Sequence, residues 1–271
     1  MLTYLPEAIQ PDVEALGNGA SHNDNGHGYA IVANDRIITG RGMQDSVVIE
    51  EFAALRRLHP DGPALFHSRL ATHGSIGEAN NHPFPVGADA RTVLAHNGIL
   101  PVEAQPGKGD DRSDTRIAAD EFFPSDPFSS FDRPATRKLI ERWLGRSNKI
   151  VILTVDPRYH YSGYIFNEQA GIWHGNSWYS NYDFEYHYSD LRPGHAAWWG
   201  IDDGCMFCCA NDCIDPETGL CLSCGFCPMC GGEESECGRG CYRLFLTAPC
   251  DGCGSDIRSC PCPLPDQHLT T

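Results

Sequence analysis

Short runs of β-branched and aliphatic residues recur through the first part of the chain, separated by turn-forming residues. They predict strands at residues 1–5, 28–32, 36–39, 64–70, 92–96 and 149–155, and a hairpin formed by residues 161–166 and 171–174. Asn34-Asp35 lies between two of these runs, so the second and third strands are expected to form a hairpin.

Three segments instead show helical periodicity. Residues 45–58 place Val48, Phe52 and Leu55 on one face, and residues 113–122 begin with the capping pair Ser113-Asp114. The third helix is predicted over residues 134–144 and ends at Gly145. Hairpins outnumber strand–helix alternations, which indicates an α+β fold with largely antiparallel sheets.

The 14 cysteines divide the chain, because none precedes Cys205. This change in composition predicts a first domain over residues 1–200 and a Cys-rich domain over residues 201–271. The second segment has few apolar residues, and a domain this small needs disulfides or metal ions to stabilise it.

Repeated pairs of cysteines two residues apart predict structural zinc, because each pair can supply two thiolates to one tetrahedral ion. The predicted ligands are Cys205, Cys208, Cys221, Cys224, Cys227, Cys230, Cys250 and Cys253. With the remaining cysteines they suffice for two to three ions. Disulfides and an iron–sulfur cluster are the alternatives, but the spacing departs from the bacterial ferredoxin pattern.

The formal net charge of −16 argues against binding to a nucleic-acid backbone or an anionic membrane surface. No apolar run approaches the length of a membrane span, and the first residues lack a signal-peptide pattern. We therefore expect a cytoplasmic protein whose Cys-rich segment contacts another protein.

Polar residues follow several predicted strands, where binding sites tend to lie. Arg69 can bind a carboxylate, Asp114 can bind an ammonium group, and Asn97-Gly98 can donate hydrogen bonds to an oxyanion. Taken singly, each has a simpler explanation as a surface ion pair, a helix cap or a turn. Likewise, His67, His82 and His96 are expected to bond strand ends and loops.

The order of the motifs is more informative than any one of them. HSRLATHGSIGEANNHPFPV is followed by TVLAHNGIL and then by SDT, and this series resembles the class II glutamine amidotransferase domain of the N-terminal-nucleophile hydrolase superfamily. The resemblance covers roughly residues 1–190 and implies a four-layer αββα sandwich. Leu70 departs from the family pattern, which has Trp at this position.

The resemblance implies hydrolysis of glutamine to glutamate and ammonia, with the ammonia passed to an acceptor on a partner protein. It implies that Arg69 binds the α-carboxylate of glutamine and that Asp114 binds its α-ammonium group. Thr72 and His73 would line the pocket. Asn97 and Gly98 would form the oxyanion hole.

The family uses an N-terminal cysteine as nucleophile, and this sequence has no cysteine before Cys205. One hypothesis is that Met-Cys precedes Met1. A second is that the protein binds glutamine without catalysis and acts as a scaffold, and a third is that Thr3 is the nucleophile. An amidohydrolase acting on another small amide is a further alternative.

The zinc prediction can be tested by elemental analysis of the purified full-length protein. We expect two to three zinc ions per chain, and Cys227→Ser should lower that number by about one because a closed site needs four ligands. Stoichiometric iron, or metal-free protein with oxidised cysteines, would contradict the prediction.

Overall fold

The computed structural model describes residues 1–71 and 74–186. Within these residues the strands form two antiparallel sheets, one of six strands and one of four. The predicted domain boundary near residue 200 and all of the cysteines lie outside the described residues. In the described part, no helix is both long and apolar enough to cross a bilayer.

The six-stranded sheet has the order β3-β2-β4-β1-β10-β9. Its strands are β1 (Leu2–Leu5), β2 (His27–Ala33), β3 (Arg36–Gly42), β4 (Ala64–Ser68), β9 (Ile172–His174) and β10 (Ser177–Tyr179). Strand β1 lies in the interior of this sheet, between β4 and β10. The predicted hairpin around Asn34-Asp35 is confirmed as β2–β3.

The four-stranded sheet has the order β5-β6-β7-β8. Its strands are β5 (Phe84–Val86), β6 (Asp89–Asn97), β7 (Lys149–Thr154) and β8 (Gly163–Phe166). Every residue of β7 is buried, and its four central residues are all apolar. Strand β6 ends at Asn97, one of the predicted site residues.

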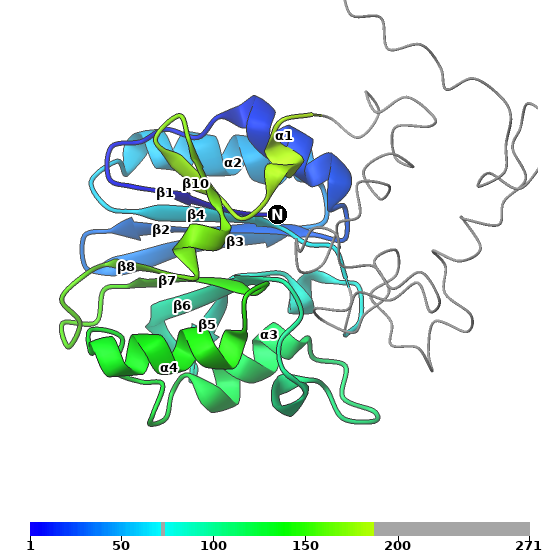
Figure 1. Cartoon of the computed structure of the whole chain (residues 1–271). Coiled ribbons are helices and arrows are strands. Elements are labelled where there is room, and N and C mark those ends of the chain that lie inside the picture. Colours follow the sequence, from blue (N-terminus) through cyan, green and yellow to red (C-terminus); the bar gives the residue numbers. More distant parts are fainter. Residues whose placement is uncertain (72–73, 187–271) are drawn as a thin grey trace, which may run out of the picture. The chain divides into compact units, whose positions relative to one another are not determined.

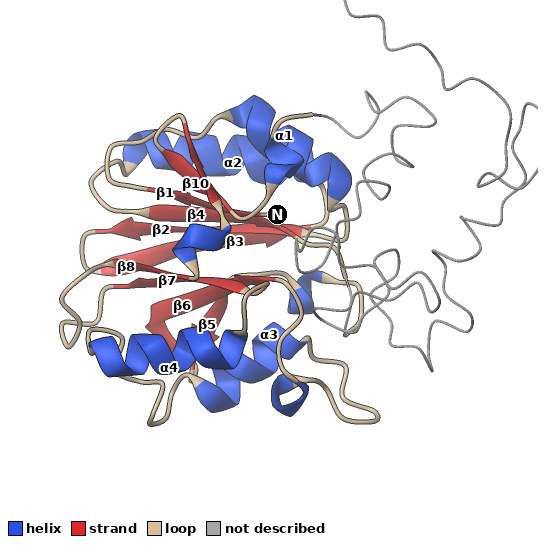
Figure 2. Ribbon diagram, in the orientation of Figure 1, coloured by secondary structure: helices blue, strands red, loops and turns tan. Residues whose placement is uncertain are grey.

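The two sheets pack face to face, and helices cover both outer faces (Figures 1 and 2). Helices α1 (Val13–His22) and α2 (Asp45–Leu58) pack on the six-stranded sheet through a core that includes Leu16 and Phe52. Helices α3 (Asp114–Ile117) and α4 (Pro134–Leu144) lie on the other side, where Ile140 joins the core beneath the four-stranded sheet. A third core, which includes Leu65 and Val151, lies between the sheets.

Short helical turns connect these elements. They are η1 (Glu78–Asn80), η2 (Val102–Ala104), the π-helical η3 (Ala118–Phe122), η4 (Glu168–Ala170) and η5 (Tyr182–Phe184). The layer order of helix, sheet, sheet and helix is that of the αββα sandwich implied by the sequence resemblance. The fold is α+β, as predicted.

One predicted pairing is wrong, because residues 161–166 and 171–174 do not form a hairpin. Strand β8 pairs with β7 in the four-stranded sheet, whereas β9 pairs with β10 in the six-stranded sheet. Asn167 turns the chain between them in a left-handed conformation, and its side-chain amide donates to the carbonyls of Gly145 and Asn148. The hairpin turn is instead Gly175-Asn176, where both residues have positive φ as a type I′ turn requires.

Candidate active site

The first residue of the chain extends strand β1 inside the sheet. The amino group of Met1 donates to the carbonyl of Ser68 at 2.7 Å, and the Ser68 amide donates back to the Met1 carbonyl at 2.9 Å. Met1 and Ser68 are therefore a hydrogen-bonded pair that continues the register in which Leu2 lies opposite His67. The side chain of Met1 is buried in the core shared with helix α1.

Extending this register by one residue places the position before Met1 opposite Arg69. Residues directly opposite in an antiparallel pair point to the same face, and faces alternate along each strand. Met1 and Leu5 face the helices, whereas Leu2 and Leu65 lie between the sheets. By this alternation, a side chain before Met1 would point between the sheets, as Arg69 does.

Arg69 is a buried cation at the end of strand β4. Its side chain is 3% exposed, and its Nη1 donates to the carbonyl of Ser75 at 3.1 Å. Burial lowers the pKa of the guanidinium, and the negative charge of Asp114 opposes this shift. Arg69 and Asp114 thus lie near enough to interact electrostatically.

Asp114 is the first residue of α3, and the side chain of Ser113 caps that helix by accepting from the Arg116 amide. Oδ2 of Asp114 accepts from the Leu100 amide at 2.9 Å, and Oδ1 accepts from the Thr115 amide at 2.7 Å. The contact with Leu100 joins the predicted ammonium-binding residue to the segment that follows Asn97-Gly98.

Asn97 and Gly98 end strand β6 of the opposite sheet. Asn97 shares the alternation of Val93 and Ala95, whose side chains lie between the sheets. Gly98 has φ +128°, and a Cβ at this position would lie 2.3 Å from Oδ1 of Asn148. Both features require glycine here. The same Asn148 oxygen forms a hydrogen bond with Nε2 of His96 at 2.9 Å. Asn148 therefore contacts both His96 and Gly98 and holds the end of β6 in place.

Three buried histidines surround this region. The rings of His67 and His82 are stacked with centroids 4.0 Å apart, and Nδ1 of His82 accepts from the His96 amide. The His96 ring also bonds the Thr115 hydroxyl. The prediction that His82 and His96 bond strand ends and loops is confirmed. His67 Nδ1 is buried and lacks a hydrogen-bond partner among the described residues.

Burial dominates the electrostatics of the site. It lowers the pKa of His67 and of His82 well below the usual value, and neighbouring cationic groups add to both shifts. Burial also lowers the pKa of the Met1 amino group to about 6, although the carboxylate of Asp183 acts in the opposite direction. At neutral pH the amino group and both imidazoles are therefore mainly uncharged.

Four of the six predicted glutamine-site residues, namely Arg69, Asn97, Gly98 and Asp114, lie in segments that hydrogen bonds join to one another. Thr72 and His73 lie outside the described residues, as do the eight predicted metal ligands. Within residues 1–71 and 74–186, no group of His, Cys, Asp and Glu side chains is arranged to hold a metal ion.

Sequence reasoning assigned no role to Asn80, Thr115 or Asn148, all of which contact the site. Thr115 belongs to the quoted SDT motif, and Asn80 to the longest quoted motif. Asn148 carries no local signal, because its importance depends on the packing of His96 and Gly98 against it.

Thr3 has a poor position for a nucleophile. It pairs with Phe66 on one side and with Tyr179 on the other, and its side chain shares the helix-facing alternation of Met1 and Leu5. It is 1% exposed. Its hydroxyl therefore faces away from the side of the sheet where Arg69 lies.

One surface hollow of the described residues lies apart from this site. It measures about 440 Å³ and is lined by Glu141, Arg142, Gly145, Arg146, Asn167, Gln169 and Ala170. None of the predicted site residues lines it. The site defined by Arg69 and Asp114 is recognised by its chemistry and hydrogen bonding.

Comparisons with known proteins give structural matches only. No family model and no curated protein matches this sequence. The solved structures similar to this chain include glutamine phosphoribosylpyrophosphate amidotransferase from B. subtilis, with 20% identity, TM-score 0.38, and coverage of 57% of this chain and 35% of that one.

An allosteric regulatory enzyme of purine biosynthesis matches with 19% identity and TM-score 0.39, over 65% of this chain and 40% of that one. A glutamine aminotransferase class-II domain protein from Silicibacter pomeroyi matches with 16% identity and TM-score 0.32, over 57% and 73% of the respective chains. The aligned region spans less than half of each of the first two proteins.

The buried histidines predict a loss of stability on acidification. Because the folded pKa of His67 and of His82 lies below the unfolded value near 6.5, only the unfolded chain gains these protons as the pH first falls. Stability should therefore decrease from about pH 6.5 downward, each histidine contributing up to about 1.4 kcal/mol per pH unit.

This can be measured by denaturant unfolding at a series of pH values. His82→Asn keeps an acceptor for the His96 amide but removes one titrating group, so it should reduce the slope below pH 6.5. An unchanged slope would show that His82 does not resist protonation in the folded protein.

Proposed function

We propose that this protein is a glutaminase of the class II glutamine amidotransferase type, with a cysteine directly before Met1 as its nucleophile. The observation that supports the proposal is the β1–β4 register, because a residue added before Met1 in this register would lie opposite Arg69 and on the same face. A residue before Met1 would also replace the buried amino group, whose pKa burial lowers to about 6, with a peptide amide that can donate the same bond to Ser68 and does not titrate.

The neighbouring residues suit one end of an amino acid. Arg69 would bind the α-carboxylate of glutamine through its planar guanidinium, and Asp114 would bind the α-ammonium group. Both side chains are nine-tenths buried or more, so their contacts with substrate are little weakened by water. Because Arg69 and Asp114 are both buried and carry opposite charges, they suit a ligand with a carboxylate and an ammonium group attached to the same carbon.

The reaction would proceed at the side-chain amide of glutamine. The thiolate attacks the amide carbon, the oxyanion accepts hydrogen bonds from the Asn97 side chain and the Gly98 amide, and ammonia leaves with a proton. Water then attacks the thioester, which releases glutamate and restores the thiol. Once the initiator methionine is removed, the free α-amino group of the cysteine would act as base, because the pKa of such a group lies near neutrality.

The Cys-rich segment supplies the second part of the proposal. We infer that its thiolates hold two to three structural zinc ions and that this segment recruits the partner that accepts the ammonia. Closed four-thiolate zinc sites stabilise small domains and leave no open position for catalysis.

The nucleophile can be tested with three forms of the protein that begin Met-Cys-Met1, Met-Ala-Met1 and Met1. Only the first should release glutamate and ammonia from glutamine, because only it carries a thiolate opposite Arg69. The alanine form should bind glutamine without hydrolysing it. Equal hydrolysis by the alanine form would contradict the proposal. Glutamine binding without turnover by all three forms would instead favour a glutamine-binding scaffold.

In the cysteine form, Arg69→Met should lower kcat/KM for glutamine by about 100-fold, because a buried charged contact with the substrate is lost. Arg91→Met is the matched control, since Arg91 is an exposed arginine paired with Asp89. If Arg69→Met has no larger effect than Arg91→Met on the true substrate, the enzyme acts on an amide that lacks an α-carboxylate.

A further inference from the structure

The two charged residues of the proposed site lie beside separate loops, since Arg69 directly follows β4 and Asp114 is the first residue of α3. Arg69 precedes the segment that contains Gly74, Ser75 and η1, whereas Asp114 follows residues 110–113. An α-amino acid holds its carboxylate and ammonium groups at a fixed separation. The relative position of these two loops must therefore be fixed for both charges to be bound at once.

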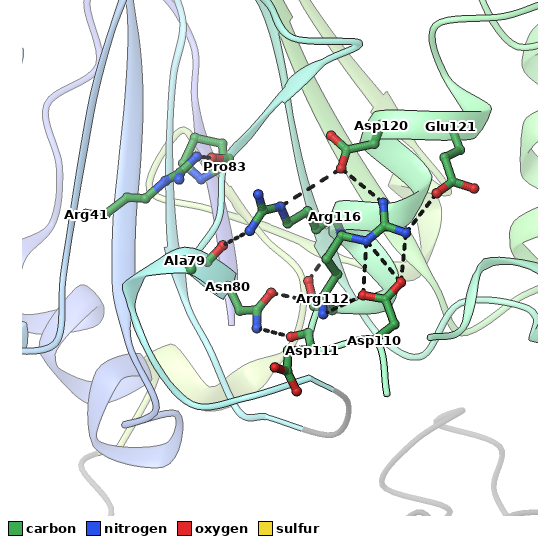
Figure 3. A network of polar contacts seen from close by, with 11 residues as sticks. Arg41, Ala79, Asn80, Pro83, Asp110, Asp111, Arg112, Arg116, Asp120 and Glu121 are labelled. Atoms are coloured by element: carbon green, nitrogen blue, oxygen red, sulfur yellow. Dashed lines mark hydrogen bonds and ion pairs between the residues drawn. The ribbon is translucent and has the colours of Figure 1, made fainter. Parts of the chain in front are cut away.

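Asn80 joins the two loops with both ends of its side-chain amide. Nδ2 donates to the carbonyl of Asp111 at 2.7 Å and lies 3.1 Å from the carbonyl of Ser75, while Oδ1 accepts from the Ser113 amide at 2.8 Å. The residue is 1% exposed. Figure 3 shows Asn80 directed toward the chain at Asp111.

The partners of Asn80 lead directly to the charged groups. The Ser75 carbonyl that accepts from Asn80 also accepts from Nη1 of Arg69. Ser113 is the N-cap of the helix whose first residue is Asp114. Asn80 thus shares the Ser75 carbonyl with Arg69, and it bonds the amide of Ser113, the residue directly before Asp114.

One backbone hydrogen bond also joins the two loops, because the Ser75 amide donates to the Asp111 carbonyl at 3.2 Å. The remaining side-chain contacts around these loops are weaker. Arg112 pairs with Asp110 and Glu121, but these side chains are about one quarter to one half exposed, and such ion pairs contribute little. Arg116 donates to the Ala79 carbonyl from an exposed position (Figure 3). The hydrogen bonds of the buried Asn80 side chain contribute more, because their loss would leave buried donors and acceptors without partners.

We propose that Asn80 is a positioning residue that sets the separation of Arg69 from Asp114 and thereby the affinity for the α-amino acid end of the substrate. The proposal rests on the proposed glutamine site. Asn80 has no role in the bond-breaking step, so its loss should weaken substrate binding far more than turnover at saturation.

The test compares Asn80→Ala and Asn80→Asp in the Met-Cys-Met1 form of the full chain. Asn80→Asp keeps the shape of the side chain and the acceptor for the Ser113 amide, but it turns a carboxylate oxygen toward the Ser75 and Asp111 carbonyls. A side chain of the right size is therefore not enough to restore the Asn80 contacts. Both variants should raise KM for glutamine about tenfold or more while kcat changes by less than about threefold. Asn18→Ala, which removes a side-chain amide bonded to the Phe184 carbonyl, is the control and should leave KM unchanged.

Amide hydrogen exchange provides a readout that does not need activity. Asn80→Ala should speed exchange at Ser75 and at Ser113 together, with no change in strand β4. If the Met-Cys-Met1 form with Asn80 intact neither binds nor hydrolyses glutamine, the proposed function fails. The hydrogen-exchange rates at Ser75 and Ser113 then decide by themselves whether Asn80 couples the two loops. Unchanged KM in an active Asn80→Asp variant, or faster exchange in one loop only, would overturn the inference.

Discussion

The pairing of β1 with β4 is the constraint on which the candidate site depends. It buries the beginning of the chain within a six-stranded sheet and holds Met1 opposite Ser68 through two reciprocal hydrogen bonds. Because side chains alternate along a strand, this single register decides which positions share a face with Arg69 and which point into the helix-facing core. Thr3 shares the helix-facing side of β1 with Met1 and Leu5, whereas Leu2 lies on the side between the sheets.

The second sheet contributes the other half of the site through the ends of its strands. Gly98 packs against Asn148 in a conformation that only glycine adopts readily, and Leu100 binds the carboxylate of Asp114. The candidate site thus combines residues at the ends of strands from both sheets. Burial of its cations and imidazoles follows from this placement, and the lowered pKa values of His67 and His82 are its electrostatic consequence.

Local signals predicted much of this architecture from the sequence. The cap at Ser113, the helix end at Gly145 and the turn at Asn34-Asp35 each depend on a few neighbouring residues, and each is present in the structure. Local signals did not predict that β8 and β9, which lie within residues 161–174, belong to different sheets. This arrangement depends on Asn167, whose side chain bonds two distant carbonyls while the backbone crosses from one sheet to the other.

The same distinction applies to the site. Arg69, Asn97, Gly98 and Asp114 could be selected because they stand in an ordered series of motifs that resembles the class II glutamine amidotransferase domain, although each residue taken singly has a simpler explanation. Asn80 and Asn148 could not, because an asparagine in a loop acquires its role only from the carbonyls and amides that the fold brings to it. Supporting residues of this kind are therefore visible only in the folded chain.

We propose that Arg69 and Asp114 together bind the charged end of an α-amino acid. The decisive measurement is a crystal structure of the Met-Ala-Met1 form with bound glutamine. We expect the α-carboxylate at the Arg69 guanidinium, the ammonium group at the Asp114 carboxylate, and the side-chain amide directed toward Asn97 and Gly98. Glutamine bound in the opposite orientation, or bound only in the hollow beside Arg142, would contradict it.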